Sequence, residues 1–310
     1  MKKNSFKKWG FMPLALLLGA CSSDKADKIS YDGEVRKVIA RVKNFVHDGN
    51  STTRTNVDPS KGFSWAANDT IGIFPEKGDQ LPFAMTSGAG TSVATITGGS
   101  WGLKTSEGYA SYYPFSRQNY FTDRGNIFFS YAGQRQTGDN STQHLGAYDL
   151  MAADNAQAKG DNLNFNFNHL GCILRLKVTV PNAGTYSSAT LCADEAVFGK
   201  KVKLDLTQAT AQLTKTETSK SITLALDDFT TPSNNYQAVL YMMCAPFDLA
   251  QKSITLKLRG ANGYTYSCTK TLSKAYAPSM LYTINFNALT LESAPSIGIG
   301  GEFETSDSDM

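Results

Sequence analysis

Residues 163–180 have the sequence Leu163-Asn164-Phe165-Asn166-Phe167-Asn168-His169-Leu170-Gly171-Cys172-Ile173-Leu174-Arg175-Leu176-Lys177-Val178-Thr179-Val180. Apolar residues and His169 take every second position up to residue 169, and from Leu170 onward the apolar residues take the other positions. Because successive side chains of a strand face opposite sides, each half predicts a strand with one buried face. The change of phase at His169-Leu170 predicts either a bulge or two strands that meet at a bend.

Short strand patterns also precede this stretch. A first strand with one apolar face is predicted over residues 38–46, and Asn68-Asp69 predicts a turn before a strand that Pro75 ends. Further strands are predicted over residues 92–97, 109–115 and 126–131. The span 138–160 is the least strand-like, and within it Leu150-Met151-Ala152-Ala153 predicts either a helical turn or a strand.

The same style continues after Pro181-Asn182-Ala183-Gly184, which breaks the pattern and predicts a domain boundary. Alternating strands are predicted over residues 202–206, 222–226, 254–258, 264–269 and 281–286, with a hairpin turn at Gly260-Ala261-Asn262-Gly263. Ala238–Cys244 is more continuously apolar and predicts a central strand. Many short strands between Gly, Asn and Pro predict an all-β chain built from sandwiches or barrels. Two halves of similar strand count are compatible with tandem sandwiches.

The N-terminal residues have the pattern of an export signal. Four lysines precede the apolar run Phe11–Leu18, which is too short to be a permanent membrane-spanning helix. The run ends in Leu18-Gly19-Ala20-Cys21, which is similar to a lipobox, so cleavage is predicted between Ala20 and Cys21, with lipid on the Cys21 thiol. The alternative is an ordinary secretory signal with Cys21 as a bystander. Residues 21–33 are polar and predict a flexible tether.

Charge excludes one class of partner. The signal holds four of the 30 basic residues and none of the 27 acidic ones, so the remaining chain has a net charge of −1. A near-neutral chain without a basic block offers no electrostatic basis for nucleic-acid binding. With no later run long enough to span a bilayer, membrane attachment is expected to come from the lipid alone.

Four cysteines remain besides Cys21, and each lies in a strand-like run: Cys172, Cys192, Cys244 and Cys268. No spacing is of the CxxC or zinc type. Cys172 is in phase with the apolar residues around it, which favours buried free thiols. Disulfides Cys172–Cys192 or Cys244–Cys268 are the alternative, because export permits them.

Neither catalytic motifs nor a cofactor site are found. The chain has no Gly-x-Ser-x-Gly elbow, P-loop, dinucleotide glycine triad or His-Glu-x-x-His. Of its three histidines, His47 and His144 are predicted in loops and His169 is expected to be structural, bonded to backbone. A glycoside hydrolase built from converging acids is an alternative, although the acids considered for it have the pattern of turn residues: Asp194, Glu195, Asp227 and Asp228. Four aspartates (Asp139, Asp149, Asp154 and Asp161) lack the spacing of an EF-hand loop, so no metal site is predicted.

Two further segments bear on assembly. The predicted loop over residues 48–56 has one charged residue after Asp48, which is Arg54. A protease specific for arginine would find Arg54 easily. A solvated loop arginine is the simpler interpretation. In the tail, residues 293–310, Ile297, Ile299 and Phe303 share one parity after the break at Pro295. A short alternating strand detached by proline is expected to fold back or to pair with another molecule.

Several motifs, in their order along the chain, carry a family resemblance. They are Leu18-Gly19-Ala20-Cys21, Thr53-Arg54-Thr55, Phe63-Ser64-Trp65, Asn68-Asp69-Thr70-Ile71-Gly72-Ile73-Phe74, Tyr112-Tyr113-Pro114-Phe115-Ser116, Asp149-Leu150-Met151-Ala152-Ala153, and Phe167-Asn168-His169-Leu170-Gly171. Together they resemble the fimbrillin, or type V pilin, family of Gram-negative anaerobes.

The resemblance implies two transthyretin-like β-sandwich domains, over residues 34–180 and 181–292, and a lipoprotein that reaches the outer membrane and the fimbrium. It also implies that a protease cuts after the first strand, at Arg54, and that removal of Val38–Val46 opens a groove. A strand from the next subunit, matched here by residues 297–303, then fills the groove. The implied partners are other pilus subunits and surface ligands of a host or bacterium. Shaft, tip and anchor roles stay open, and Arg41 is a rival cleavage point.

One alternative function is a surface lipoprotein that binds glycan without polymerising, on aromatics such as Trp65, Trp101 or Tyr113. A place in a sandwich core is the favoured interpretation of those three side chains.

Overall fold

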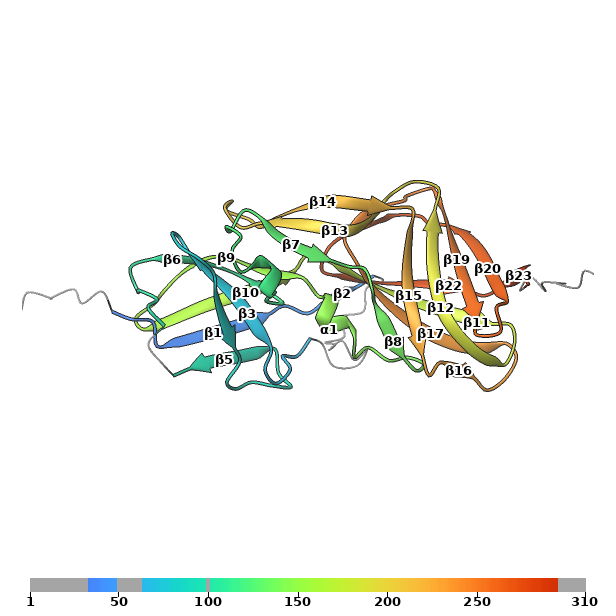
Figure 1. The fold of residues 1–310 in the computed structure, drawn as a ribbon, viewed down its shortest axis with the longest axis horizontal. Coiled ribbons are helices and arrows are strands. Elements are labelled where there is room, and N and C mark those ends of the chain that lie inside the picture. The colour runs from blue at the N-terminus through green and yellow to red at the C-terminus, as the bar shows by residue number, and fades with distance from the viewer. Residues whose placement is uncertain (1–32, 49–62, 99–100, 295–310) are drawn as a thin grey trace, which may run out of the picture. The chain divides into compact units, whose positions relative to one another are not determined.

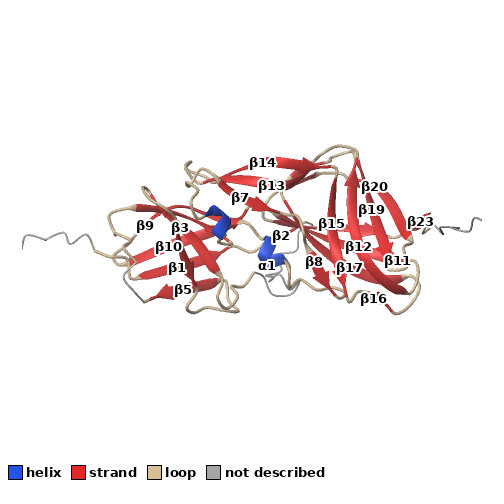
Figure 2. Cartoon of the chain, in the orientation of Figure 1, coloured by secondary structure: helices blue, strands red, loops and turns tan. Residues whose placement is uncertain are grey.

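The computed structural model describes residues 33–48, 63–98 and 101–294. Strands make up most of these residues (Figure 2), and the helices among them are short: η1 (Arg117–Asn119), a 3₁₀ turn, and α1 (Leu145–Tyr148). The prediction of an all-β chain is therefore confirmed. No helix in the described ranges has the length and apolar character needed to cross a membrane.

The first half of the described chain forms one seven-stranded sheet around its own core. In spatial order its strands are β4 (Leu81–Ala84), β3 (Thr70–Pro75), β6 (Gly108–Tyr113), β9 (Met151–Gln157), β10 (Asn162–His169), β1 (Lys37–Val42) and β5 (Val93–Thr97). Side chains from β1, β3 and β10 meet in this first core, which is rich in aromatic residues such as Trp65 and Phe165.

The second core is a sandwich of two sheets. One sheet has the order β17 (Tyr236–Cys244), β11 (Cys172–Val180), β22 (Met280–Phe286) and β2 (Val46–His47). The other has the order β23 (Thr290–Ser293), β20 (Thr265–Thr271), β19 (Ser253–Gly260), β12 (Gly184–Ala193), β15 (Ser221–Asp227) and β8 (Arg135–Thr137), with β16 (Thr230–Thr231) also on β12. Leu174 and Leu240 of the first sheet and Leu191 and Leu256 of the second are fully buried in the shared core, as expected for aligned sheets.

Two small sheets complete the described chain. One has the order β14 (Gln212–Ser219), β13 (Phe198–Asp205) and β7 (Ile127–Ser130), and the other pairs β18 (Phe247–Asp248) with β21 (Ala275–Tyr276). A third apolar cluster joins the two halves, because it takes Phe45, Tyr112 and Leu150 from the first and Val202 and Met243 from the second.

The phase change at His169-Leu170 separates two strands rather than marking a bulge. β10 ends at His169 in the first sheet, and β11 begins at Cys172 in the second. Between them, a Cβ on Gly171 would lie 3.0 Å from the Cys244 carbonyl oxygen, so only glycine fits there without a shift. Because β11 lines the second core, we propose that the domain boundary lies at Leu170-Gly171 and not at Pro181.

The sequence predicts the span 138–160 to be the least strand-like, with either a helical turn or a strand over residues 150–153. The strand is found, as β9, because the first sheet supplies partners on both sides of Ala152-Ala153. Two other predictions of local structure were wrong. β17 lies at the edge of its sheet rather than in the centre. The predicted strand 38–46 is interrupted after Val42, and its last residue, Val46, is 58% exposed.

The described cysteines are free thiols. Cys172 and Cys244 face each other as partners on β11 and β17, and both are buried, which confirms the core position predicted for Cys172. Cys192 and Cys268 are partly exposed.

Candidate functional site

Most residues predicted to act in processing and assembly lie outside the described ranges: Ala20, Cys21, Arg54, Ile297, Ile299 and Phe303. The segment predicted to be removed is described. It runs as β1, a three-residue connection and β2, and we call residues 37–48 the first-strand segment.

β1 is paired along both of its edges (Figure 1). It runs parallel to β10, with Ala40 opposite Phe165, and antiparallel to β5, with Ala40 also opposite Ala94. Its inward-facing side chains, Val38, Ala40 and Val42, are buried in the first core. Removal of β1 would therefore leave β10 and β5 each with an unpaired edge.

β2 belongs to the other half of the chain. It runs parallel to β22, where the Val46 N–H donates to the Ser279 carbonyl at 2.9 Å and the Asp48 N–H donates to the Leu281 carbonyl at 3.0 Å. One short segment thus completes a sheet in each half.

A buried polar pair lies where the segment passes from one sheet to the other. His169 Nδ1 is 2.8 and 2.9 Å from the two carboxylate oxygens of Asp149, and both side chains are fully buried. His169 Nε2 is 2.5 Å from the Lys43 carbonyl oxygen, and the imidazole stacks on Phe45 with ring centroids 3.7 Å apart. We call His169 and Asp149, with these contacts to Lys43 and Phe45, the His169 clamp. His169 is bonded to backbone as expected, but its second partner is the Asp149 carboxylate.

Aromatic rings enclose the clamp. Phe63 contacts His169 edge-on, and Trp65 packs edge-on against both Tyr113 and Phe167. The Tyr113 hydroxyl donates to Asp69 at 3.0 Å, and burial raises the pKa of the Asp69 carboxyl above its ordinary value. Within the described part of the chain the buried indole N–H of Trp65 has no hydrogen-bond partner, so ring packing holds this side chain.

The three aromatic residues considered for glycan binding do not form an exposed surface on which a sugar could stack. Trp65 and Tyr113 are buried in the first core, which confirms the core interpretation, and Trp101 is partly buried against Phe83. Exposed aromatic residues of the described ranges lie elsewhere: Tyr120, Phe121 and Phe128 around η1 and β7, where Phe121 is 87% exposed, and Tyr264 between β19 and β20.

Several of the residues considered for catalysis or metal binding are already bound to other groups of the chain. Glu195 binds Lys252 at 2.8 Å, Asp227 pairs with Arg135, and Asp139 accepts from the Val239 N–H. His144 Nε2 contacts the Tyr241 carbonyl, and His47 lies in β2 rather than in a loop. Within the described ranges no group of three or more His, Cys, Asp or Glu side chains could hold a metal ion.

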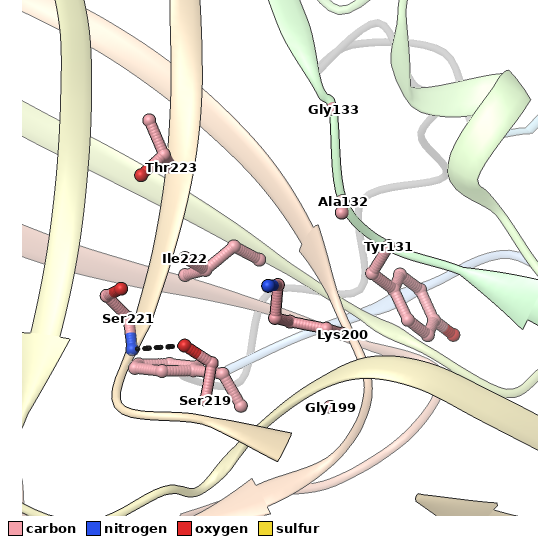
Figure 3. Close-up of a pocket in the computed structure, with 10 residues that line it drawn as sticks. Tyr131, Ala132, Gly133, Gly199, Lys200, Ser219, Ser221, Ile222 and Thr223 are labelled. Carbon is pink, nitrogen blue, oxygen red and sulfur yellow. Dashed lines mark hydrogen bonds between the residues drawn. The ribbon is translucent and has the colours of Figure 1, made fainter. Parts of the chain in front are cut away.

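A hollow of about 210 Å³ lies between the connection that follows β7 and the strands β13 and β15. Figure 3 shows residues that line it. It is lined by Tyr131, Ala132, Gly133, Phe198, Gly199, Lys200, Ser219, Ser221, Ile222 and Thr223. None of these residues is an acid, a histidine or a cysteine. The single charged group, Lys200, is paired with Glu217 at 3.3 Å, so these side chains offer no acid or base for hydrolysis.

Sequence reasoning missed the His169 clamp. The available signal was a histidine at an inward position, in phase with Phe165 and Phe167, since a buried imidazole needs a partner for each nitrogen. Its partner, Asp149, stands beside apolar Leu150-Met151, and an acid at the start of an apolar strand is a second signal of the same kind.

Comparisons with known proteins found one family and several similar solved structures. A model of the fimbrillin-like family matches residues 53–299. A putative cell adhesion protein from Bacteroides ovatus is similar in structure, with a TM-score of 0.52 and 14% identity over 84% of this chain and 95% of that chain. A putative cell adhesion protein from Bacteroides uniformis gives a TM-score of 0.48 and 15% identity, over 74% and 93% of the two chains. A fimbrial protein from Bacteroides ovatus gives 0.34 and 12%, over 83% of this chain and 49% of that chain. No curated protein matches in sequence.

Proposed function

Because the chain belongs to the fimbrillin-like family, we propose that it is a structural and adhesive subunit of a type V pilus, without enzymatic activity, whose polymerisation is driven by exchange of its first strand. In this proposal the chain is exported as a lipoprotein on Cys21 and reaches the outer membrane and the cell surface. Its partners are other pilus subunits and the surfaces to which the pilus adheres. Its two cores are tandem transthyretin-like domains.

One observation carries the proposal: the first-strand segment is the shared completing strand of two sheets. If it left, β10, β5 and β22 would each lose a hydrogen-bonded partner strand. The groove that holds Val38, Val42 and Phe45, which we call the seat of the first-strand segment, would then open to water. Burial of such side chains is worth about 1.5–3 kcal/mol each, and unpaired strand edges attract other strands. A vacated seat therefore favours an incoming strand.

The segment also ends close to the predicted cleavage point. Asp48 is its last residue, and Arg54 follows six positions later in the sequence. The proposed donor is the tail of a second copy, with Ile297, Ile299 and Phe303 on its inward face. Since donor and acceptor surfaces differ, this head-to-tail contact does not close on itself and builds a filament.

Substitution Arg54→Ala tests the cleavage step. We expect the variant to stay uncut and monomeric at the cell surface, while Arg41→Ala, which removes the rival arginine, is cut and polymerises as the parent does. Arg41 is a suitable control because it is exposed and bonded only outside the core, to Asn164 at 2.9 Å. Intact mass and N-terminal sequence of surface protein give the cut, and gel analysis of unboiled samples gives the polymer. Normal cleavage and assembly of Arg54→Ala would refute the assigned site.

A further inference from the structure

We propose that the hollow beside Lys200 (Figure 3) is a binding site for an acidic sugar, a single ring that carries one carboxylate. None of the residues that line the hollow belongs to the first-strand segment, so binding there does not depend on strand exchange. The hollow combines the three features that such a ligand needs: a cation for the carboxylate, polar groups for the hydroxyls, and an apolar wall for the ring.

The cation is Lys200, whose charge the protein neutralises only in part. Its Nζ is 3.3 Å from one oxygen of Glu217, while Lys201 Nζ is 2.9 Å from the other oxygen of the same carboxylate. Two ammonium groups thus share one carboxylate, and the three side chains carry a net charge of +1. In Figure 3 the Lys200 side chain extends toward Ile222, and both residues line the hollow. A ligand carboxylate in the hollow is therefore attracted.

Backbone groups of β15 supply polar partners along an open stretch of its edge. β8 pairs with β15 only over Ala225, Leu226 and Asp227, and there the Ala225 N–H donates to the Gln134 carbonyl at 2.9 Å. Backbone groups of successive residues alternate between the two edges of a strand, so the Thr223 N–H and carbonyl point to the same side as those of Ala225. In the described sheets no strand lies opposite Thr223 on this side. One donor and one acceptor therefore face the hollow.

Hydroxyl groups and an apolar wall complete the lining. Ser219 Oγ accepts from the Ser221 N–H at 3.1 Å, as the dashed line in Figure 3 shows, and its own hydrogen can still be donated. Phe198 and Ile222 are buried in the second core and also line the hollow, where they offer carbon atoms to the CH groups of a sugar ring. A simple carboxylic acid would leave the hydroxyls and the backbone acceptor unused, whereas the hydroxyl groups of a sugar match them.

The size of the hollow limits the ligand to one ring. Its volume of about 210 Å³ lies below the roughly 300–1,000 Å³ of sites for drug-sized molecules. A peptide that binds as an added strand needs a longer free edge, and here the free edge is at most residues 221–224, because β15 begins at Ser221 and β8 covers it from Ala225 onward. The hollow therefore favours a compact acid over an extended chain.

The test is a titration of the purified protein with glucuronate, followed by ligand-observed NMR, with glucose as the neutral sugar of the same ring size. We expect a dissociation constant of about 1 mM for glucuronate, as for other ligands of this size. Glucose should bind about fivefold more weakly, a modest factor because Lys200 is half-exposed and solvent screens its charge. No binding of glucuronate in the millimolar range, or equal binding of the two sugars, would overturn the proposal.

Two lysine variants locate the site. Lys200→Gln removes the ammonium that lines the hollow, so we expect glucuronate to bind about fivefold more weakly and glucose as it does to the parent. Lys203→Gln is the matched control, because Lys203 lies on the same strand but contacts Asn126 at 3.5 Å and does not line the hollow. Thermal unfolding of both variants shows whether the fold is intact. Parental affinity of Lys200→Gln, or an equal loss in Lys203→Gln, would overturn the assignment of Lys200.

A hydroxyl variant and a peptide probe test the class of ligand. Ser221→Ala removes a hydroxyl that both sugars use, so we expect both to bind about threefold more weakly. Trialanine, a short peptide with a free carboxylate, should bind more weakly than glucuronate, because it lacks the hydroxyl groups. Unchanged binding of both sugars to Ser221→Ala, or tighter binding of trialanine than of glucuronate, would overturn the assignment of the hollow to a sugar.

Discussion

At the scale of the residue, His169 shows how one buried side chain can link two sheets. Its backbone ends β10, its imidazole holds the Lys43 carbonyl of the first-strand segment, and its own carbonyl accepts from Ser279 beside β22 at 2.8 Å. Each contact satisfies a polar group that would otherwise be buried without a partner. The junction between the halves is therefore specified by hydrogen bonds as well as by apolar packing.

Chemical reactivity of the thiols gives a test at this scale. Burial raises the pKa of Cys172 to about 12, and it raises that of Cys244 well above its usual value. At pH 8 roughly one Cys172 thiol in ten thousand would be ionised, and the buried sulfur is also shielded. We expect iodoacetamide to modify Cys192 and Cys268, which are partly exposed, while Cys172 and Cys244 react only after unfolding. Peptide mass mapping measures this, and equal labelling of all four in the folded protein would contradict the packing.

Side-chain alternation predicted the inward residues of β1 and β10 because burial of one face is a local property of sequence. The partner of His169 could not be predicted in the same way. Asp149 lies 20 residues away along the chain, and only the pairing of β9 with β10 brings the two together. The buried face of the first strand could thus be predicted from the sequence. The His169 clamp could be found only from the three-dimensional structure.

At the scale of the element, the outer edge of β17 is closed by side chains instead of a strand. Gln134 accepts from the Met243 N–H and donates to its carbonyl, both at 2.7 Å, and Gln136 accepts from the Tyr241 N–H and donates to the Val239 carbonyl. Each amide imitates the donor and acceptor of a neighbouring strand. Strand addition at this edge is therefore blocked, which agrees with the proposal that an incoming strand takes the place of the first-strand segment.

The edge closure predicts the behaviour of Gln136→Leu. Gln136 is fully buried, and Gln136→Leu removes the acceptor that its side chain gives the Tyr241 N–H, at a cost of about 1–3 kcal/mol, whereas the Val239 carbonyl still accepts from the Asn140 N–H at 3.0 Å. We expect lower stability in urea and concentration-dependent self-association through the opened edge, measured by sedimentation velocity. Gln237→Leu, an exposed position of the same strand, is the matched control. A stable, monomeric Gln136→Leu would show that the amide does not close the edge.

The wrong prediction for β17 and the undecided prediction for β9 have the same physical origin. Continuous apolar sequence in Ala238–Cys244 favoured a central strand, but such a strand can also lie at an edge when other side chains cover it. β9 lacked a clear alternation because both of its faces are buried at Met151–Ala153, against the first core on one side and the third cluster on the other. In both strands the burial comes from residues far away in the sequence, so a local sequence pattern could not predict the position of β17 or the state of β9.

At the scale of the whole molecule, the first-strand segment couples the two cores. Its inward residues stabilise the first sheet, β2 completes the second sandwich, and Phe45 lies in the cluster that joins them. Replacement of this segment by a strand from a neighbour would keep both sheets complete and make each subunit depend on the next. A filament built in this way needs no new fold, only a change in which chain supplies the strand.

The most direct test fixes β1 in place with a disulfide. Arg41 and Val93 are partners on β1 and β5, and both are exposed. The Val42 N–H donates to the Ser92 carbonyl, so the next pair along, Arg41 and Val93, is not hydrogen-bonded and has the closer Cα spacing that suits a disulfide. Arg41→Cys alone is the control.

The measurement is polymer formation by purified Arg41→Cys/Val93→Cys protein after treatment with an arginine-specific protease, with and without reductant. We expect the oxidised protein to be cut at Arg54 but to remain monomeric, because β1 cannot leave, and the reduced protein and the single variant to form filaments. Filaments from the oxidised protein, with the disulfide confirmed by mass, would contradict strand exchange as the means of assembly.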